Sequence, residues 1–288
     1  MIRVAHWAKN LFLYIPLFFA GDLFDLTRML DVTLGVLAFS LVASSIYILN
    51  DIKDLANDRR HPVKRHRALA SGKVSIPTAI IIMSCLAIGG LLLSWHCGSK
   101  FFCIACLYLL LNVGYSFGLK NISILDIIIL STGFVLRIKG GAAIAEIGIS
   151  QWLTIMVFLL SLFLALAKRR DDLLLKRIPD NNTRRSISGY NLAFLNVSLA
   201  IVSAIMIIAY LMYTLSPEVI KHMGTYRLYY TTIFVFAGLL RYLQFIFIQN
   251  DTRSPIRILY KDHFIQICLA LWVLSFYCFL YFRDFHIW

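Results

Sequence analysis

The chain has 288 residues, of which 60% are hydrophobic and 15% are charged, and its mean hydropathy is +0.77. Soluble domains contain roughly 45–50% apolar residues, so this composition excludes a soluble globular protein and indicates a polytopic membrane protein. The net charge of +13 is carried mostly by short loops between apolar runs. This placement argues against nucleic acid as a partner and favours phosphorylated small molecules and anionic lipids.

Apolar runs of membrane-spanning length recur along the whole chain. They predict an all-α bundle of about nine transmembrane helices, formed as a single integral membrane domain by residues 1–288. The first span is weak because Lys9, Asn10 and Pro16 interrupt it. The expected spans lie near residues 9–26, 33–50, 75–95, 101–118, 122–138, 151–167, 192–215, 229–248 and 264–282.

Six cysteines lie mostly inside these apolar runs. Cys103 and Cys106 have a spacing that occurs in redox and metal sites, but no second pair accompanies them. We therefore expect buried, reduced thiols.

The most informative stretch follows the second apolar run without a break and begins Asn50-Asp51-Ile52-Lys53-Asp54. If the helix continues here, Asp51, Asp54 and Asp58 lie at i, i+3 and i+7 on one face. Carboxylates this close repel one another and need a cation between them. Oxygen ligands suit Mg²⁺, which shares its coordination shell with substrate phosphates. The pattern predicts a metal site made by the three acids together with Asn50.

Basic residues follow these acids directly, and they would hold phosphate oxygens that the metal does not reach. They are Arg59, Arg60, His61, Lys64, Arg65, His66 and Arg67. Basic residues alone would be explained by the positive-inside rule, but orientation in the membrane needs no carboxylates. The order of acids and then bases therefore predicts a site for a magnesium-bound diphosphate, with Asp51, Asp54 and Asp58 as its catalytic residues.

The distribution of charge predicts the topology. If the loop 51–74 lies in the cytoplasm, 20 Lys and Arg residues fall on that side and 7 on the other. This excess agrees with the positive-inside rule. It places the N-terminus inside and the loop 51–74 at the cytoplasmic face.

A second charged segment, Lys168-Arg169-Arg170-Asp171-Asp172, follows the apolar run that ends at Ala167 and opens another long loop. Lys168 with Arg169 or Arg170 would bind phosphate, and Asp171 or Asp172 would bind a second Mg²⁺ or a sugar hydroxyl. The alternative is one more positive-inside loop end. Because the two long loops lie about four spans apart, a pseudo-symmetric bundle would place both over one cavity, and this pairing favours the site.

Three ionisable residues lie within apolar runs, where charge is costly and indicates a site by default. They are Asp126, Arg137 and Arg241. We rank Asp126 above both arginines, because either arginine could extend its charged head to the interface. Of the two arginines, Arg241 ranks below Arg137. Lys9 and Lys120 add polar groups on the cytoplasmic side, with interfacial anchoring as the alternative.

Together these motifs resemble the UbiA superfamily of intramembrane prenyltransferases. Asn50-Asp51-x-x-Asp54-x-x-x-Asp58 is similar to its NDxxDxxxD signature, and the basic segment after it looks like the decaprenyl-phosphate phosphoribosyltransferase branch. Ala68 departs from a usual Pro, and Asp171-Asp172 from a usual x-Glu. Further segments with a likeness to that branch are His6 to Phe12, Leu125-Asp126, Gly133 to Arg137, Ser161 to Leu173, Arg241 to Leu243 and Ser254-Pro255.

The resemblance implies nine helices around a central cavity that opens to the cytoplasm, with a Mg²⁺ site at the cytoplasmic face of a bacterial inner membrane. It implies transfer of 5-phosphoribose from phosphoribosyl diphosphate to a polyprenyl phosphate, and it leaves a homo-oligomer open. The alternatives are a prenyltransferase acting on an aromatic or lipid acceptor and a non-catalytic lipid-phosphate carrier. The substrate-binding residues so implied are Lys9, Asn50, His61, Lys64, Arg67, Lys120, Asp126, Arg137, Lys168, Arg169, Asp171 and Asp172.

Overall fold

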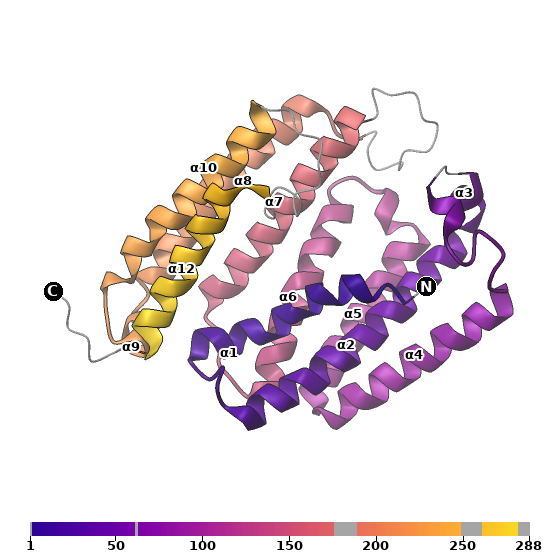
Figure 1. Ribbon diagram of the computed structural model, residues 1–288, viewed down its shortest axis with the longest axis horizontal. Helices are drawn as coiled ribbons and strands as arrows, with labels where there is room; N and C mark the ends of the chain where they lie inside the picture. The colour runs from indigo at the N-terminus through magenta and orange to yellow at the C-terminus, as the bar shows by residue number, and fades with distance from the viewer. Residues whose placement is uncertain (1, 61–62, 176–188, 249–260, 282–288) are drawn as a thin grey trace. The chain divides into compact units, whose positions relative to one another are not determined.

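The computed structural model describes residues 2–60, 63–175, 189–248 and 261–281, and every regular element within them is a helix (Figure 1). Eight of these helical segments are long and apolar enough to cross a membrane. They confirm an all-α membrane bundle. The segments are α2 (Leu26–Lys53), α4 (Ile76–His96), α5 (Ser99–Phe117), α6 (Leu125–Ala145), α7 (Gln151–Leu175), α8 (Leu192–Thr214), η5 (Arg227–Thr231) continued by α10 (Thr232–Phe247), and α12 (His263–Tyr281).

The first of the nine expected spans differs from the prediction. Its residues form a 3₁₀-helix, η1 (Val4–Tyr14), followed by the short helix α1 (Ile15–Ala20), which ends at Gly21 in the left-handed conformation. Pro16 lies in the first turn of α1, where its missing N–H costs no helical hydrogen bond, so it favours a new helix start at this point. The segment therefore contributes two short helices and no full span.

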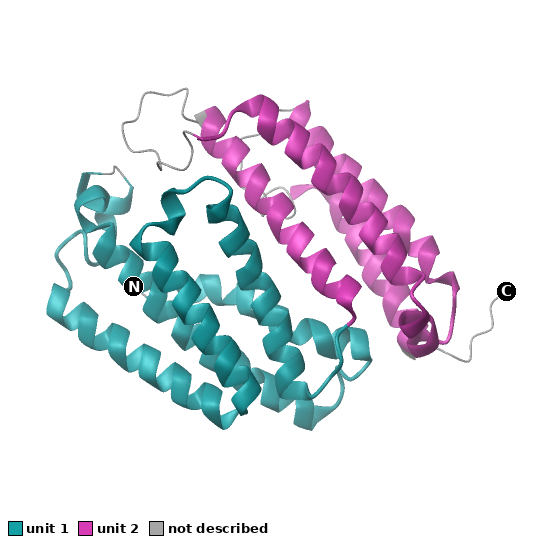
Figure 2. Ribbon diagram, turned by 180° about the vertical axis from the view of Figure 1, so that it is seen from behind, with its two compact units in different colours: residues 1–149, 181–186 teal, residues 150–180, 187–288 magenta. Residues whose placement is uncertain are grey.

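The helices form two compact units, shown in Figure 2. Among the described residues, unit 1 comprises those up to residue 149 and unit 2 those from residue 150 onward. Each unit holds four of the eight candidate spans, which matches the four-span spacing of the two charged segments. That residues 1–288 form one domain stays a prediction.

In unit 1, α2 packs against α4, α5 and α6, while η1 and α1 lie against α6. The core contains the fully buried side chains of Leu13, Phe39 and Phe101. A Cβ at Gly90 of α4 would lie 2.9 Å from the Val42 backbone nitrogen and 3.0 Å from the Ala38 carbonyl oxygen. The absence of a side chain there lets α4 approach the backbone of α2 closely, as in other membrane helix pairs.

In unit 2, α7 packs against α8 and α10 packs against α12. Helix α7 runs through Leu175, so the prediction that a loop opens at Lys168 is wrong. Lys, Arg and Leu are good helix formers, and Arg169 pairs with Asp172 one turn later, so the charged segment continues the helix beyond the apolar run.

The cysteines are all free, but most of them are not buried as expected. Only Cys268 is buried, while Cys85, Cys103 and Cys278 are exposed. The prediction treated an apolar run as a buried one. In a membrane helix an apolar side chain can face lipid, so apolar sequence does not imply burial in the protein.

Gly141 supplies a test of the packing in unit 1. A Cβ there would lie 1.9 Å from the carbonyl oxygen of Leu13 in η1, whereas a Cβ at Gly89 meets nothing within 4 Å. We expect Gly141→Ala to destabilise the protein by about 1–3 kcal/mol, because overpacking displaces backbone. Gly89→Ala should be neutral or slightly stabilising, since Ala favours helix. Thermal unfolding of the purified protein in detergent measures both, and equal midpoints would contradict the packing.

Candidate active site

The acidic motif lies where α2 ends. Asp51 is in the last turn of α2, and Asp54 is its C-cap residue, with an N–H that donates to the Asn50 carbonyl oxygen at 2.9 Å. The short helix α3 (Leu55–Arg60) follows and carries Asp58, whose N–H donates to the Asp54 carbonyl oxygen at 2.8 Å. The expected helical continuation is thus interrupted at Asp54, although hydrogen bonds of helical spacing continue through the break.

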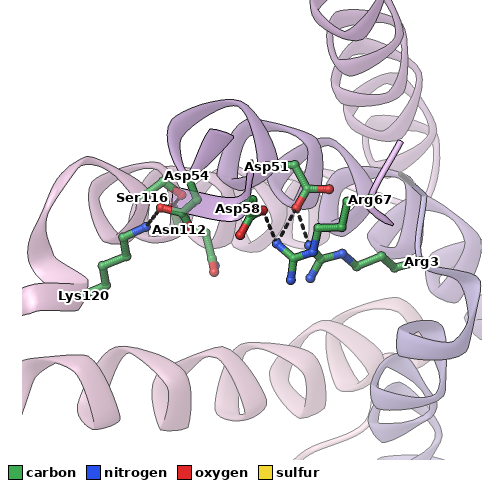
Figure 3. A network of polar contacts seen from close by, with 8 residues as sticks. All are labelled: Arg3, Asp51, Asp54, Asp58, Arg67, Asn112, Ser116 and Lys120. Atoms are coloured by element: carbon green, nitrogen blue, oxygen red, sulfur yellow. Dashed lines mark hydrogen bonds and ion pairs between the residues drawn. The ribbon is translucent and has the colours of Figure 1, made fainter. Parts of the chain in front are cut away.

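Asp51 and Asp58 share one cation, the guanidinium of Arg67 (Figure 3). Its Nη1 lies 3.2 Å from Oδ1 of Asp51 and 2.6 Å from Oδ2 of Asp58. Arg3 forms a second ion pair with the same Oδ1 of Asp51. Only 5% and 4% of the two acidic side chains is exposed, and burial makes their charges costly unless they are paired. The cation that close carboxylates require is therefore supplied here by arginine.

Asp54 has a different partner. Its Oδ1 accepts a hydrogen bond from Nζ of Lys120 at 2.6 Å, on the other side of the acidic pair from Arg67 in Figure 3. Lys120 belongs to the 3₁₀-turn η3 (Leu119–Asn121), directly after α5. The Asp54 side chain is 38% exposed, far more than those of Asp51 and Asp58. The expected set of three acids is thus divided into a buried pair and a more exposed single residue.

The geometry can be tested against a Mg²⁺ ion. Within the described ranges, no three Asp, Glu, His or Cys side chains converge in a way that could hold a metal. Mg²⁺ does not require three, because it is usually bound by one or two carboxylates together with water and substrate phosphates. Asp51 and Asp58 already converge on one shared positive charge, that of Arg67. Their oxygen donors fit Mg²⁺, with Asp54 and Asn50 available nearby.

Arg137 is buried inside unit 1. It donates from Nε to Asn10 at 2.8 Å, from Nη1 to the Gly133 carbonyl oxygen at 2.7 Å and from Nη2 to the Tyr108 hydroxyl at 3.0 Å. The ring of Phe39 is 5.0 Å from its guanidinium carbon. This residue therefore connects η1, α5 and α6 at depth.

The other site residues predicted for unit 1 lie on several elements. Asp126 is fully buried in the first turn of α6, while Lys9 belongs to η1. Asn50 is half-buried in α2, and Lys64 is exposed in the 3₁₀-turn η2 (Lys64–His66). His61 falls outside the described residues.

Arg3 was missed by the sequence analysis. It contributed there only to the count of basic residues on the cytoplasmic side. Its partner Asp51 lies 48 positions away, and no local spacing or motif reports a contact at that distance along the chain.

The charged segment of α7 forms its own contacts within unit 2. Arg169 donates from Nη1 to Asp172 at 2.9 Å and is almost fully buried. Arg170 donates from Nε to Asn196 of α8 at 2.8 Å. Asp171 is also buried, and Lys168 is exposed. The segment is helical, and three of its five charged residues, Arg169, Arg170 and Asp171, are buried.

Arg241, the lowest-ranked candidate, also belongs to an ion pair in unit 2. Its Nη2 lies 2.9 Å from Oδ2 of Asp262, just before α12. Burial by itself would raise the pKa of the Asp262 carboxyl, but hydrogen bonds from Arg241 and from the Ile265 backbone N–H lower it below its ordinary value. Arg241 therefore anchors the start of α12.

Comparison with known proteins identifies the family. The UbiA prenyltransferase family matches residues 11–265. This chain belongs to that family. The match supports the interpretation of the chain as a membrane-embedded transferase.

Two relatives of this UbiA-family protein are named decaprenyl-phosphate phosphoribosyltransferase. The protein from Mycolicibacterium smegmatis is 31% identical over 94% of this chain and 88% of its own length. That from Corynebacterium glutamicum is 29% identical over 94% and 83%. A UbiA homologue from Archaeoglobus fulgidus, bound to GPP and Mg²⁺, superimposes with a TM-score of 0.72 at 19% identity, over 97% of this chain and 98% of that one. The last similarity shows that the fold is shared.

The ion pairs of this UbiA-family site predict unequal effects of two substitutions. Arg67→Gln removes the cation shared by two buried carboxylates, so we expect a loss of about 3 kcal/mol in stability. Lys120→Gln removes the partner of the more exposed Asp54, and its cost should be about 1 kcal/mol or less. Thermal unfolding without added metal compares the two variants. A larger loss for Lys120→Gln would show that the shared guanidinium is not the main stabilising contact.

Proposed function

We propose that this UbiA-family protein transfers 5-phosphoribose from phosphoribosyl diphosphate to a polyprenyl phosphate and releases diphosphate. The observation that carries the proposal is the pair of buried carboxylates, Asp51 and Asp58, gathered on the guanidinium of Arg67 beside further basic groups. The names of the relatives from Mycolicibacterium smegmatis and Corynebacterium glutamicum support the choice of donor and acceptor.

The proposed cofactor is Mg²⁺, held by Asp51, Asp54 and Asp58 with Asn50 as a further ligand. Bound there, it would neutralise the negative charge that develops on the departing diphosphate. Asp51 and Asp58 have the buried, preorganised oxygens of this set, and Asp54 is exposed enough to turn toward a ligand. The UbiA homologue solved with GPP and Mg²⁺ supports a divalent metal in this fold.

The basic residues have the role of holding phosphate oxygens of the donor. Arg67 and Lys120 already form ion pairs with the acids, and Lys64 lies on the same short segment as Arg67. We include Lys9 and His61 with them. From α7, we assign phosphate binding to Lys168 and Arg169 and ribose hydroxyls to Asp171 or Asp172, and these four assignments rest on the sequence motif.

The acceptor needs no dedicated base in this reaction, because a phosphate monoester is already anionic near neutral pH. Substitution at the sugar carbon should pass through an oxocarbenium-like transition state, as in other glycosyl transfers. Asp126 and Arg137 are the buried polar residues of α6 that we assign to substrate binding. The isoprenoid tail would lie along apolar helix surfaces.

The proposed location is the bacterial inner membrane, with a central cavity open to the cytoplasm. The excess of basic residues in the sequence segments 51–74 and 168–185 supports this orientation. A water-soluble donor would then enter from the basic face, and the lipid acceptor from the bilayer. The presence of a homo-oligomer is left open by this proposal.

A prenyltransferase acting on an aromatic or lipid acceptor is the second candidate. Structures of the Archaeoglobus fulgidus homologue with GPP and with DMAPP favour it, since both are prenyl diphosphates. The basic sequence segment from His61 to Arg67 argues against it, because it offers more phosphate-binding groups than one prenyl diphosphate needs. A non-catalytic lipid-phosphate carrier would have no use for the acidic motif.

Donor choice distinguishes these candidates directly. Purified protein supplied with Mg²⁺, phosphoribosyl diphosphate and a polyprenyl phosphate should form a lipid-linked phosphoribose and release diphosphate, measured by mass spectrometry and a diphosphate assay. Turnover of GPP with none of phosphoribosyl diphosphate would favour the prenyltransferase. Binding of the lipid without consumption of either donor would favour the carrier.

Asp54 offers the safest test of the metal assignment, because its exposed side chain makes folding less dependent on it. Asp54→Ala should lower kcat about 100-fold or more, since a metal ligand supports several kcal/mol of transition-state stabilisation. Asp22→Ala is the matched control, since it removes another aspartate paired to a cation, Arg28, before the start of α2. Full activity in Asp54→Ala would refute the assignment of this residue.

A further inference from the structure

Oxygen Oδ1 of Asp51 accepts from two guanidinium groups at once, those of Arg3 and Arg67. The arginine side chains are 26% and 32% exposed, whereas that of Asp51 is 5% exposed. The cations therefore lie on the solvent side of the acid and cover it. Any other cation that binds this oxygen must replace one of them.

The backbone holds Arg3 in this position. Arg3 is the N-cap residue of η1 and has a left-handed conformation, with φ of +47°, which is unfavourable for a residue with a side chain. Next to it, the Ile2 carbonyl oxygen accepts from the Ser44 hydroxyl at 3.1 Å, and Trp7 donates to the same hydroxyl at 3.1 Å. The start of the chain is thus fixed along α2, on the side that leads to Asp51.

We propose that Arg3 is a donor-binding residue that exchanges partners. Before metal binding it neutralises Asp51. When a divalent cation binds the acids, Arg3 is released from Oδ1 and its guanidinium binds phosphate oxygens of the donor. This inference rests on the proposed function, because it requires a metal-bound diphosphate at Asp51 and Asp58.

Charge explains why the exchange is favourable. Two cations that share one oxygen repel each other, so a divalent ion on Asp51 displaces the neighbouring guanidiniums. A phosphate group then offers Arg3 a partner of higher charge and with matching geometry for a bidentate contact. The site can stay neutralised throughout, first by its own arginines and later by metal and substrate together.

The exchange predicts that loss of the Arg3 charge changes two binding affinities in opposite directions. Loss of the Arg3 charge removes a competitor for Asp51, so the affinity for a divalent cation should rise. It also removes a phosphate ligand, so the affinity of the metal-loaded protein for a diphosphate should fall. A residue that only supports the fold would weaken both or change neither.

The test uses the full-length protein in detergent and the variant Arg3→Gln, which keeps polarity and much of the length but not the charge. Mn²⁺, a paramagnetic substitute for Mg²⁺, is titrated alone and followed by electron paramagnetic resonance. Pyrophosphate is then titrated into the Mn²⁺-loaded protein. We expect Mn²⁺ to bind about three- to tenfold more tightly and pyrophosphate about three- to tenfold more weakly, the range of a partly exposed charge pair.

Two further variants keep the result interpretable. Arg28→Gln removes an arginine paired with Asp22 and Asp25, at the opposite end of α2 from Asp51, and should change neither affinity. Arg3→Lys keeps the positive charge and should keep Mn²⁺ affinity near that of the unmodified protein. If Arg3→Gln fails to fold, the effect of charge at position 3 is tested by comparing Arg3→His with Arg3→Lys at pH 6 and pH 8. The histidine loses its charge between these two pH values and the lysine does not, so Mn²⁺ affinity should rise more from pH 6 to pH 8 in Arg3→His.

The proposal is overturned if Arg3→Gln weakens Mn²⁺ binding, or if it leaves pyrophosphate binding unchanged. Neither titration uses phosphoribosyl diphosphate or lipid. A protein that shows both shifts but does not consume phosphoribosyl diphosphate would therefore refute the proposed function and keep Arg3 as a diphosphate-binding residue. A protein that turns over this donor but shows no shift in Arg3→Gln would refute only the inference.

Discussion

The site depends on the neutralisation of two buried carboxylates at the end of a membrane helix. Asp51 and Asp58 would repel each other, and burial would make each charge costly, so a cation must lie between them. Arg67 takes this position from a separate turn, and its side chain stays partly open to solvent. Because the acids are fixed by the helices and the cation lies on a long, partly exposed side chain, the cation is the part that can be exchanged.

The same constraint explains why the first apolar segment is no ordinary span. Helix α2 has a polar side, on which Ser40 and Ser44 accept hydrogen bonds from Asn10 and Trp7. These contacts hold η1 against α2 and bring Arg3 to Asp51. Asn10, one of the residues that weaken the segment as a transmembrane helix, is thus also one of the residues that attach it to α2.

Sequence predicted well what the bilayer alone imposes and poorly what depends on contacts between distant residues. Long apolar runs must become helices, because no water satisfies their backbone groups, and eight of the nine expected spans correspond to helical segments long enough to cross a membrane. The loop predicted to open at Lys168 is helical, because hydropathy marks where apolar residues end and not where hydrogen bonding ends. The division of Asp54 from Asp51 and Asp58 depends on Lys120 and Arg67, whose positions no local pattern gives.

Arg137 is buried among neutral partners, in contrast to the arginines that pair with Asp51. Its hydrogen-bond partners in the described structure are neutral groups of Asn10, Gly133 and Tyr108, and aromatic rings surround its guanidinium. Movement of this side chain would break contacts to η1 and α5 together. The arginines at Asp51 have acidic partners and solvent access, so they can leave when another cation arrives. The buried contacts of Arg137 therefore hold η1 in place, while the charge of Arg3 at its start can exchange partners.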